Sequence, residues 1–335
     1  MTAIALPFAE LTPHRVLDLL DLVGLHGDGR LLQLNSYENR VFLVWLEDGS
    51  SIVAKFYRPG RWSNAQILEE HAFARELAAA EVPVVAPLTL RADGDGVQLL
   101  GDDRTLAVTA DERFAVAPNR PGRPIELEDP QALSWIGRFL GRIHQVGSRG
   151  RFTHRRRLDI DTLGRAAFDR LVDGDSLTPA EAGPWQAAAR TALSLVAERY
   201  AEIPDATWLR VHGDCHPGNL LWTDAGPHFV DLDDTGTGLA VQDMWMLLPG
   251  DVAGAERCTH HLLEGYEAIR DFDRRELRLV EPLRTLRMIY HSAWIAERWQ
   301  DPAFPAAFPW YGSAAYWSQQ TTQLREQCER MTDDR

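Results

Sequence analysis

The segment of this sequence best suited to chemistry lies at residues 212–219, which read His-Gly-Asp-Cys-His-Pro-Gly-Asn. The Pro-Gly pair prevents a regular helix, so we expect a loop that follows the strand-like residues 208–211. This loop presents Asp214 and, five positions later, Asn219. A carboxylate can accept the proton of a hydroxyl group, and an amide oxygen can bind a hard metal ion. Asp214 is therefore a candidate catalytic base, and Asn219 is a candidate metal ligand.

A second carboxylate follows on a predicted hairpin. Residues 219–222 continue as a strand, the turn 223–226 reverses the chain, and the return strand leads to Asp231. A hairpin of this length brings Asp231 back beside Asn219. An amide oxygen and a carboxylate that converge on one point suit Mg²⁺, which also keeps waters and phosphate oxygens as ligands. We therefore expect Asn219 and Asp231 to bind Mg²⁺, and Asp231 to take part in catalysis through that metal.

Other interpretations of the loop stay open at this point. His212, Asp214 and His216 could form a transition-metal site, although a zinc-protease motif needs two histidines on one helix face with a glutamate between them. A lone aspartate in a turn is also often a structural cap. We expect His212 and His216 to pack the loop, and Cys215 to be buried and unreactive, because no base is placed beside it.

Nearly all the basic residues are arginines, and Lys55 is the single lysine among 35 lysines and arginines. It lies in the middle of a β-forming segment, Val53–Tyr57, which resembles the strand of kinases whose lysine contacts the α- and β-phosphates of ATP. A compact ammonium and a planar guanidinium are not interchangeable at a tight phosphate contact. We attribute the abundance of arginine elsewhere to a composition bias.

The predicted helix after this strand supplies the carboxylate that Lys55 needs. Ser63 and Gln66 have the spacing of a capping box, and the helix is expected over 65–80. By its position in the kinases that the strand resembles, Glu70 is the expected partner of Lys55, with Glu69 as the alternative.

A nucleotide-binding loop is expected one strand pair before Lys55, at residues 34–40. This loop has no Gly-rich motif, but its backbone amides and the hydroxyl of Ser36 could still hold phosphate. A switch that depends on a long activation loop is not expected, because only about ten residues separate Asp231 from the predicted helix 240–248. Asp243, in that helix, is expected to bind backbone amides beneath the loop 212–219.

The elements that must position these residues predict an α+β fold with two lobes. Residues 1–116 are expected to form a β-rich, nucleotide-binding N-lobe with an antiparallel sheet and one regulatory-type helix. A connector rich in Pro, Gly and Arg follows at 118–124. Residues 117–335 are expected to form a larger helical C-lobe that carries the catalytic loop, the metal site and the substrate region. The expected N-lobe strands are 40–46, 52–57, 97–100, 106–109 and 114–117, and the expected helices are 13–23, 65–80, 130–147, 179–200, 240–248, 256–269 and 275–298.

Composition excludes several classes of protein. The chain has 335 residues, 45% of them hydrophobic, and a formal net charge of −14, which disfavours disorder and sequence-independent nucleic-acid binding. Three scattered cysteines do not make a disulfide framework. The chain lacks an apolar run of about 18 residues, and its first fifteen residues do not read as a signal peptide. We therefore expect a cytoplasmic protein that binds neither nucleic acid nor membrane.

These motifs together resemble the protein-kinase-like superfamily in its aminoglycoside-phosphotransferase branch. The signature of that branch is a His-Gly-Asp-x-His-x-x-Asn loop followed by Asp-x-Asp, present here at 212–219 and 231–233. Flanking segments, among them 34–41, 55–59, 67–71, 241–248, 281–284 and 301–305, resemble the bacterial stress-response kinases of this branch.

The resemblance implies a bilobal protein-kinase-like fold and a cytoplasmic serine/threonine protein kinase that uses ATP and Mg²⁺. Such a kinase phosphorylates protein substrates, including itself, and counteracts stress-induced cell death. The resemblance implies that Asp214 is the catalytic base, that Asn219 and Asp231 are the Mg²⁺ ligands, and that Ser36 contacts ATP. Two alternatives are a small-molecule kinase acting on an amino alcohol, sugar or aminoglycoside, and a pseudokinase that binds without turnover. The complete set of Lys55, Asp214, Asn219 and Asp231 disfavours the pseudokinase.

Overall fold

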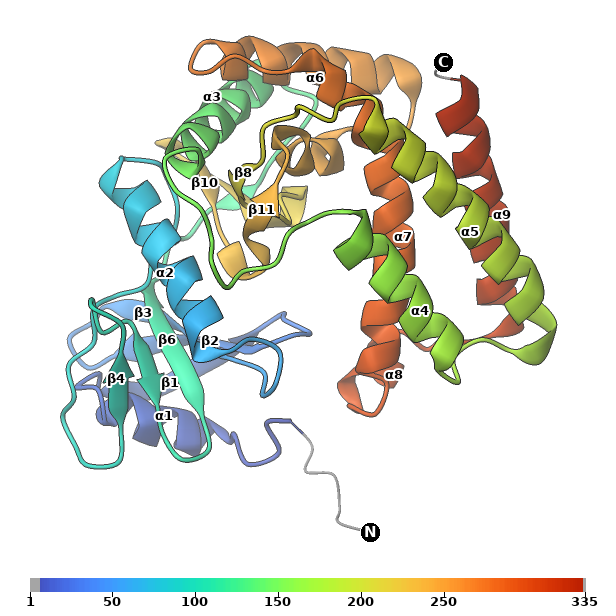
Figure 1. Ribbon diagram of the computed structural model, residues 1–335. Helices are drawn as coiled ribbons and strands as arrows, with labels where there is room; N and C mark the ends of the chain where they lie inside the picture. Colours follow the sequence, from blue (N-terminus) through green and yellow to red (C-terminus); the bar gives the residue numbers. More distant parts are fainter. Residues whose placement is uncertain (1–6, 334–335) are drawn as a thin grey trace. The chain divides into compact units, whose positions relative to one another are not determined.

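The computed structural model describes residues 7–333 and divides into two compact units (Figure 1). The first unit contains residues 7–125 together with 153–155 and 218–233, and the second contains 126–152, 156–217 and 234–333. The predicted hairpin with Asn219 and Asp231 thus folds with the first unit, although it follows the connector. The lobe boundary at 116/117 stays a prediction. The prediction that the first fifteen residues are not a signal peptide falls partly on residues 1–6, which lie outside the described residues.

The first unit is built on a six-stranded antiparallel sheet in the order β1-β2-β3-β6-β5-β4. The strands are β1 (Gly27–Leu34), β2 (Arg40–Leu46), β3 (Ser51–Phe56), β4 (Gln98–Leu100), β5 (Leu106–Val108) and β6 (Arg113–Pro118). Five of them match the predicted strands closely. The remaining strand, β1, was not predicted, because its start, Gly-Asp-Gly-Arg, has the composition of a turn and its side chains are mostly exposed.

Helices α1 (Pro13–Asp21) and α2 (Asn64–Ala79) pack on opposite faces of this sheet (Figure 1). Alternation along β3 sorts its side chains between the faces. Ala54 and Phe56 join the core cluster that contains the buried residues of α1, whereas Tyr57 packs in the cluster with Ile67 of α2. Lys55, between Ala54 and Phe56, therefore points to the face that α2 covers.

Helix α2 begins where its sequence predicts. The Ser63 side chain accepts a hydrogen bond from the backbone of Gln66, and the Gln66 side chain accepts one from the backbone of Ser63. This capping box fixes the start of the helix and hence which residues face inward. Glu70, on the buried side, is placed toward Lys55 in this way.

A second, smaller sheet in the first unit carries the predicted hairpin. Strands β9 (Leu220–Thr223) and β10 (Gly226–Phe229) pair antiparallel, and β7 (Arg123–Pro124) adds to β9. The sequence predicts this hairpin correctly. Phe229, at its end, is fixed to the main part of the unit by hydrogen bonds with the backbone of Pro83 and Val85.

The second unit is mainly helical. Its helices are α3 (Pro130–Gly147), α4 (Ala166–Asp173), α5 (Pro179–Ala201), α6 (Val252–Glu267), α7 (Val280–Glu297), α8 (Ala303–Ala307) and α9 (Ala314–Asp333). Helices α3 and α6 approach each other through Gly137 and Gly265, where a Cβ atom would collide with backbone carbonyls of the facing helix. Two short strands, β8 (Leu209–Val211) and β11 (Gly236–Gly238), pair beside the loop that contains Asp214.

The remaining short elements are helical turns. They are the π-helical turn η1 (Asp161–Arg165) and the 3₁₀ turns η2 (Pro217–Asn219), η3 (Leu232–Asp234), η4 (Ala240–Asp243), η5 (Trp245–Leu247) and η6 (Arg274–Leu279). The predicted helix over 240–248 is wrong, because η4 and η5 occupy it. Pro249 disfavours a helical Leu248, and the Glu276 side chain binds the backbone N–H of Val241.

The predicted helix 275–298 begins later, at Val280. Pro282 in its first turn lacks an N–H and would clash with the carbonyl four residues earlier in a continuous α-helix, so η6 precedes α7. Helices α4, α8 and α9 were not predicted. Among residues 7–333, no helix has the combined length and apolar character that a membrane crossing requires.

Candidate active site

Lys55 lies at the centre of an acidic cluster in the first unit. Its Nζ is 2.7 Å from Oδ1 of Asp233, 3.3 Å from Oδ1 of Asp231 and 3.8 Å from Oε1 of Glu70. The ring of Tyr57 lies 5.2 Å away. The Lys55 side chain is only 17% exposed, and burial by itself disfavours an ammonium. The three carboxylates outweigh this effect and hold the pKa of Lys55 well above its usual value.

The carboxylate of α2 beside Lys55 belongs to Glu70, as expected. Glu69, the alternative, points elsewhere and accepts backbone hydrogen bonds from residues 153–155. Burial raises the pKa of Glu70 above its usual value, and Lys55 only partly offsets the effect. The pair is thus held in a dry environment where its charge interaction is strong.

The hairpin β9–β10 brings Asn219 and Asp231 onto neighbouring positions. The backbone carbonyl of Asn219 accepts a hydrogen bond from Val230 at 3.0 Å, which continues the ladder of the hairpin. Asp231 follows in a left-handed conformation with φ of 58°, which aspartate tolerates better than most residues. The Asp231 side chain, just after β10, contacts Lys55 and stays 55% exposed.

These two residues fit a hard divalent cation. Asp231 offers an accessible carboxylate that makes one ion pair with Lys55, and Asn219 offers an amide oxygen. Carboxylate, carbonyl and water oxygens are the ligands that Mg²⁺ takes. The donor set therefore suits Mg²⁺ better than it suits a soft transition metal.

Asp233 was missed as a site residue, although it is the partner nearest to Lys55. Its side chain is 4% exposed, and its Oδ2 lies 2.6 Å from Nη1 of Arg61. Burial would raise the pKa of Asp233, but Lys55 and Arg61 outweigh burial and lower it. The Asp-x-Asp pattern was the signal that could have found this residue.

The loop 35–39 is fixed by residues that sequence analysis also missed. Arg58, just after β3, donates a hydrogen bond from Nε to the carbonyl of Glu38 at 2.9 Å and one from Nη2 to the carbonyl of Tyr37 at 3.1 Å. Arg61 lies 3.5 Å from the Glu38 carboxylate. The hydroxyl of Ser36 accepts a hydrogen bond from the backbone of Asn39 at 3.3 Å. The loop is thus shaped by side chains instead of by glycines, and Arg61 connects it to Asp233.

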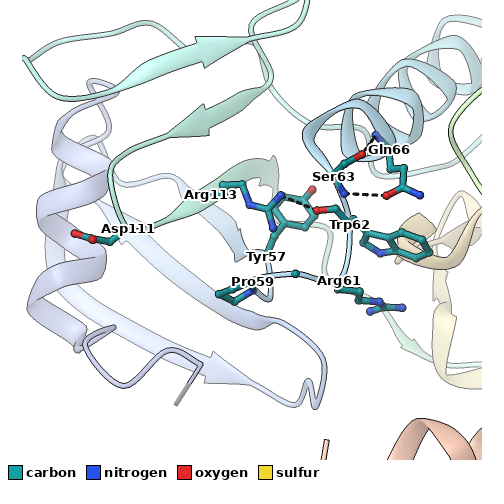
Figure 2. Close-up of a pocket in the computed structure, with 9 residues that line it drawn as sticks. Tyr57, Pro59, Arg61, Trp62, Ser63, Gln66, Asp111 and Arg113 are labelled. Atoms are coloured by element: carbon teal, nitrogen blue, oxygen red, sulfur yellow. Dashed lines mark hydrogen bonds between the residues drawn. The ribbon is translucent and has the colours of Figure 1, made fainter. Parts of the chain in front are cut away.

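A pocket of about 560 Å³ lies beside the loop 59–63 (Figure 2). Arg113 donates a hydrogen bond from Nη1 to the carbonyl of Trp62 at 2.7 Å, and the Ser63–Gln66 capping box forms another part of the wall (Figure 2). Arg61 lines the same pocket and also binds Asp233, so the pocket adjoins the cluster around Lys55.

Asp214 lies in the second unit, on a loop that Asp243 supports. The Asp243 carboxylate accepts hydrogen bonds from the backbone of His212 at 2.7 Å and of Gly213 at 2.8 Å, as predicted. His144 lies 3.0 Å from the same carboxylate. Burial disfavours the ionised form of Asp243, but these partners lower its pKa below the usual value. Gly213 has φ of 90°, and a Cβ atom there would strike the backbone of Asp234, so the turn before Asp214 requires glycine.

Asp214 itself contacts two basic side chains. Its Oδ1 lies 2.9 Å from Nη1 of Arg287 on α7, and its Oδ2 lies 3.6 Å from Nε2 of His216. Arg287 comes from 73 residues further along the chain and was not predicted. His216 is 39% exposed and lies beside Asp214, and its predicted role in packing the loop stays a prediction.

The other two loop residues behave as expected. His212 and Cys215 are fully buried, and burial raises the pKa of the Cys215 thiol well above its usual value, which keeps it protonated and unreactive. The transition-metal interpretation finds no support here. In the described part of the chain, the group of possible ligands that converges within 4.8 Å is His260, His261 and Glu264 on α6, outside this loop.

The known proteins that this chain resembles in sequence are named as phosphotransferases and kinases. The profile of the phosphotransferase enzyme family matches residues 30–280. Stress response kinase A of Salmonella choleraesuis is 42% identical over 323 residues, which cover 96% of this chain and 94% of that protein. Serine/threonine protein kinase RdoA of Salmonella typhimurium is 41% identical with the same coverage, and stress response kinase A of Escherichia coli K12 is 40% identical over 97% of this chain and 95% of its own.

Solved structures show the same fold at lower identity. The amicoumacin kinase hAmiN, in complex with AMP-PNP, Ca²⁺ and Ami, has a TM-score of 0.68 and 19% identity over 96% of this chain and 93% of its own. A microcompartment-associated aminopropanol kinase has a TM-score of 0.69 and 18% identity over 96% and 98%. The predicted α+β, kinase-like fold is confirmed.

Proposed function

This chain belongs to the phosphotransferase enzyme family, and we propose that it is an ATP- and Mg²⁺-dependent serine/threonine protein kinase of the bacterial stress response. The observation that carries the proposal is the cluster in which one ammonium, Lys55, meets Glu70, Asp231 and Asp233, with Asn219 beside Asp231 on the hairpin. The names of relatives that are 40–42% identical over nearly the whole chain favour protein as the acceptor.

Each side chain has a defined task in such a transfer. Lys55 binds and orients the phosphates of ATP, with Glu70 and Asp233 keeping its ammonium charged and in place. Asn219 and Asp231 would hold Mg²⁺, which neutralises phosphate charge when bound. Ser36 and the amides of the loop 35–39 contact the nucleotide.

Asp214 acts on the acceptor. Its carboxylate accepts a hydrogen bond from the serine or threonine hydroxyl, aligns the oxygen with the γ-phosphorus and takes the proton as the oxygen–phosphorus bond forms and ADP leaves. Arg287 and His216 hold this carboxylate in position. Most of the catalysis is positioning and charge neutralisation.

The acceptor is a serine or threonine of a protein, including this protein itself, and the site of action is the cytoplasm. The alternative is a hydroxyl of an amino alcohol, sugar or aminoglycoside. It is favoured by the short connection between Asp231 and η4, which leaves little chain for a peptide platform, and by structural relatives named as small-molecule kinases.

Incubation of the pure protein with γ-labelled ATP and Mg²⁺ tests the proposal. We expect Mg²⁺-dependent label on serine or threonine of the protein and of a generic protein acceptor. Label on an amino alcohol or aminoglycoside, with none on protein, would replace the proposal by the alternative.

A further inference from the structure

The carboxylate of Glu69 is bound by three consecutive backbone amides. Thr153 donates its N–H to Oε1 at 2.6 Å, and His154 and Arg155 donate theirs to Oε2 at 2.8 Å. Gln66, one turn earlier on α2, donates its side-chain amide to the carbonyl of His154 at 3.0 Å. Hydrogen bonds to an ionised group are the strong ones in proteins, so α2 and the segment 153–155 are firmly joined.

Helix periodicity gives the adjacent glutamates different tasks. Residues three apart share a helix face, whereas neighbours are rotated by about 100° from each other. Gln66 and Glu69 therefore face the segment 153–155, and Glu70 faces Lys55. A shift of α2 that broke the Glu69 contacts would also move Glu70 away from Lys55.

The segment 153–155 also contacts Asp233, a second carboxylate beside Lys55. The Arg155 guanidinium lies over the ring of Trp62 at 4.2 Å and donates a hydrogen bond to the backbone carbonyl of Asp233. Asp233 is the partner nearest to Lys55. Glu69 is thus connected to two of the three carboxylates around the ammonium, to Glu70 along the helix and to Asp233 through Arg155.

We propose that Glu69 is a positioning residue that sets the geometry of Lys55 by anchoring α2 and, through Arg155, Asp233. The effect of Glu69 on ATP binding rests on the proposed function. The geometric part does not, because all the contacts that carry it lie within one compact unit of the protein.

The single lysine of the chain makes this measurable without ATP. An amine-acylating reagent that modifies the full-length protein reports on Lys55 and the N-terminal amine alone, and mass spectrometry of the digested protein separates the two. The Lys55 side chain is only 17% exposed and is held by Glu70 and Asp233, so a reagent reaches its amine only when these contacts open. Loosening Glu70 and Asp233 should therefore speed the modification.

We expect Glu69→Ala to accelerate acylation of Lys55 roughly three- to tenfold at a temperature well below unfolding, because the contacts that cover Lys55 open more often. Glu76→Ala, which removes the same group from the same helix about two turns later, is the matched control and should leave the rate within about twofold of wild type. In a Glu70→Ala background, Glu69→Ala should have a smaller effect than in wild type, because part of its action passes through Glu70.

Equal rates for wild type and folded Glu69→Ala, or equal acceleration by Glu76→Ala, would overturn the inference. Should Glu69→Ala fail to fold, Glu69→Gln, which keeps the shape and one acceptor oxygen, serves in its place under the same criteria. Addition of ATP and Mg²⁺ separates this inference from the proposed function. ATP that failed to slow acylation of wild-type Lys55 would count against the function, while the rates without ATP would still decide the role of Glu69.

Discussion

Asp231 and Asp233 are two residues apart and both contact Lys55, yet the side chain of Asp231 is exposed and that of Asp233 is buried. The Asp231 side chain is 55% exposed and makes one ion pair with Lys55. Asp233 is 4% exposed and lies between two cations, 2.7 Å from Lys55 and 2.6 Å from Arg61. Replacing each aspartate by asparagine removes one charge and almost no volume. The pair of variants therefore separates stability from catalysis.

The size of each effect follows from burial. Removing one partner of a buried ion pair destabilises a protein by about 3–5 kcal/mol, whereas an exposed pair contributes about 0–1 kcal/mol. Asp233→Asn also leaves Lys55 and Arg61 facing each other without their shared anion. At roughly 2–4 °C per kcal/mol for a chain of this size class, Asp233→Asn should lower Tm by about 6–20 °C. Asp231→Asn should lower it by no more than about 4 °C.

Thermal unfolding and Mg²⁺-dependent phosphoryl transfer, measured on the same preparations, test this contrast. Asp231→Asn should lose about 100-fold or more in transfer rate, because the metal loses its carboxylate ligand, while it remains nearly as stable as wild type. A Tm for Asp231→Asn well below that of Asp233→Asn would refute the prediction that Asp233 stabilises the fold and that Asp231 contributes mainly to transfer. So would an Asp231→Asn variant with the activity of wild type.

Three further outcomes are expected. Lys55→Arg should reduce kcat/KM by about 100-fold or more with Tm nearly unchanged, because the charge remains but the compact ammonium is lost; an active variant in a transfer assay would make that lysine incidental. Arg58→Met should raise the KM for ATP by about tenfold with a smaller change in kcat, since the carbonyls of the loop 35–39 lose their donor, and an unchanged KM in steady-state kinetics would remove the loop from nucleotide binding. Burial lowers the pKa of His71 to about 3 from the usual 6.5, so the unfolded chain binds the proton first and stability falls as the pH drops below about 6.5. Urea unfolding from pH 7 to 4 should show that His71→Gln flattens this fall by up to about 1.4 kcal/mol per pH unit, and an unchanged slope would show that His71 is not the group responsible.

Much of the fold was predictable because its signals are local. The capping box at Ser63 and Gln66 sets both the start and the rotation of α2, and rotation decides that Glu70 faces Lys55. The hairpin 220–229 is equally local, since its turn and strand lengths alone place Asp231 beside Asn219. For these features the sequence pattern and the packing agree.

The contacts that the sequence did not predict join residues far apart in the chain. Arg61 meets Asp233 across 172 positions, and Arg287 meets Asp214 across 73. A surface arginine and a buried ion-pair partner look the same in a sequence, particularly in a chain with 34 arginines. The predicted helix at 240–248 fails for a related reason, because the distant Glu276 binds the backbone of Val241 and competes with helical hydrogen bonds.

The central claim is that Asp214 serves the acceptor hydroxyl while the cluster around Lys55 binds ATP. Its most direct test is the phosphoryl-transfer rate of Asp214→Asn at saturating ATP and Mg²⁺, with ATP affinity measured on the same protein. The account predicts a rate reduced by about 10²–10⁴-fold with ATP affinity within about twofold of wild type. Transfer at the wild-type rate by Asp214→Asn would contradict it.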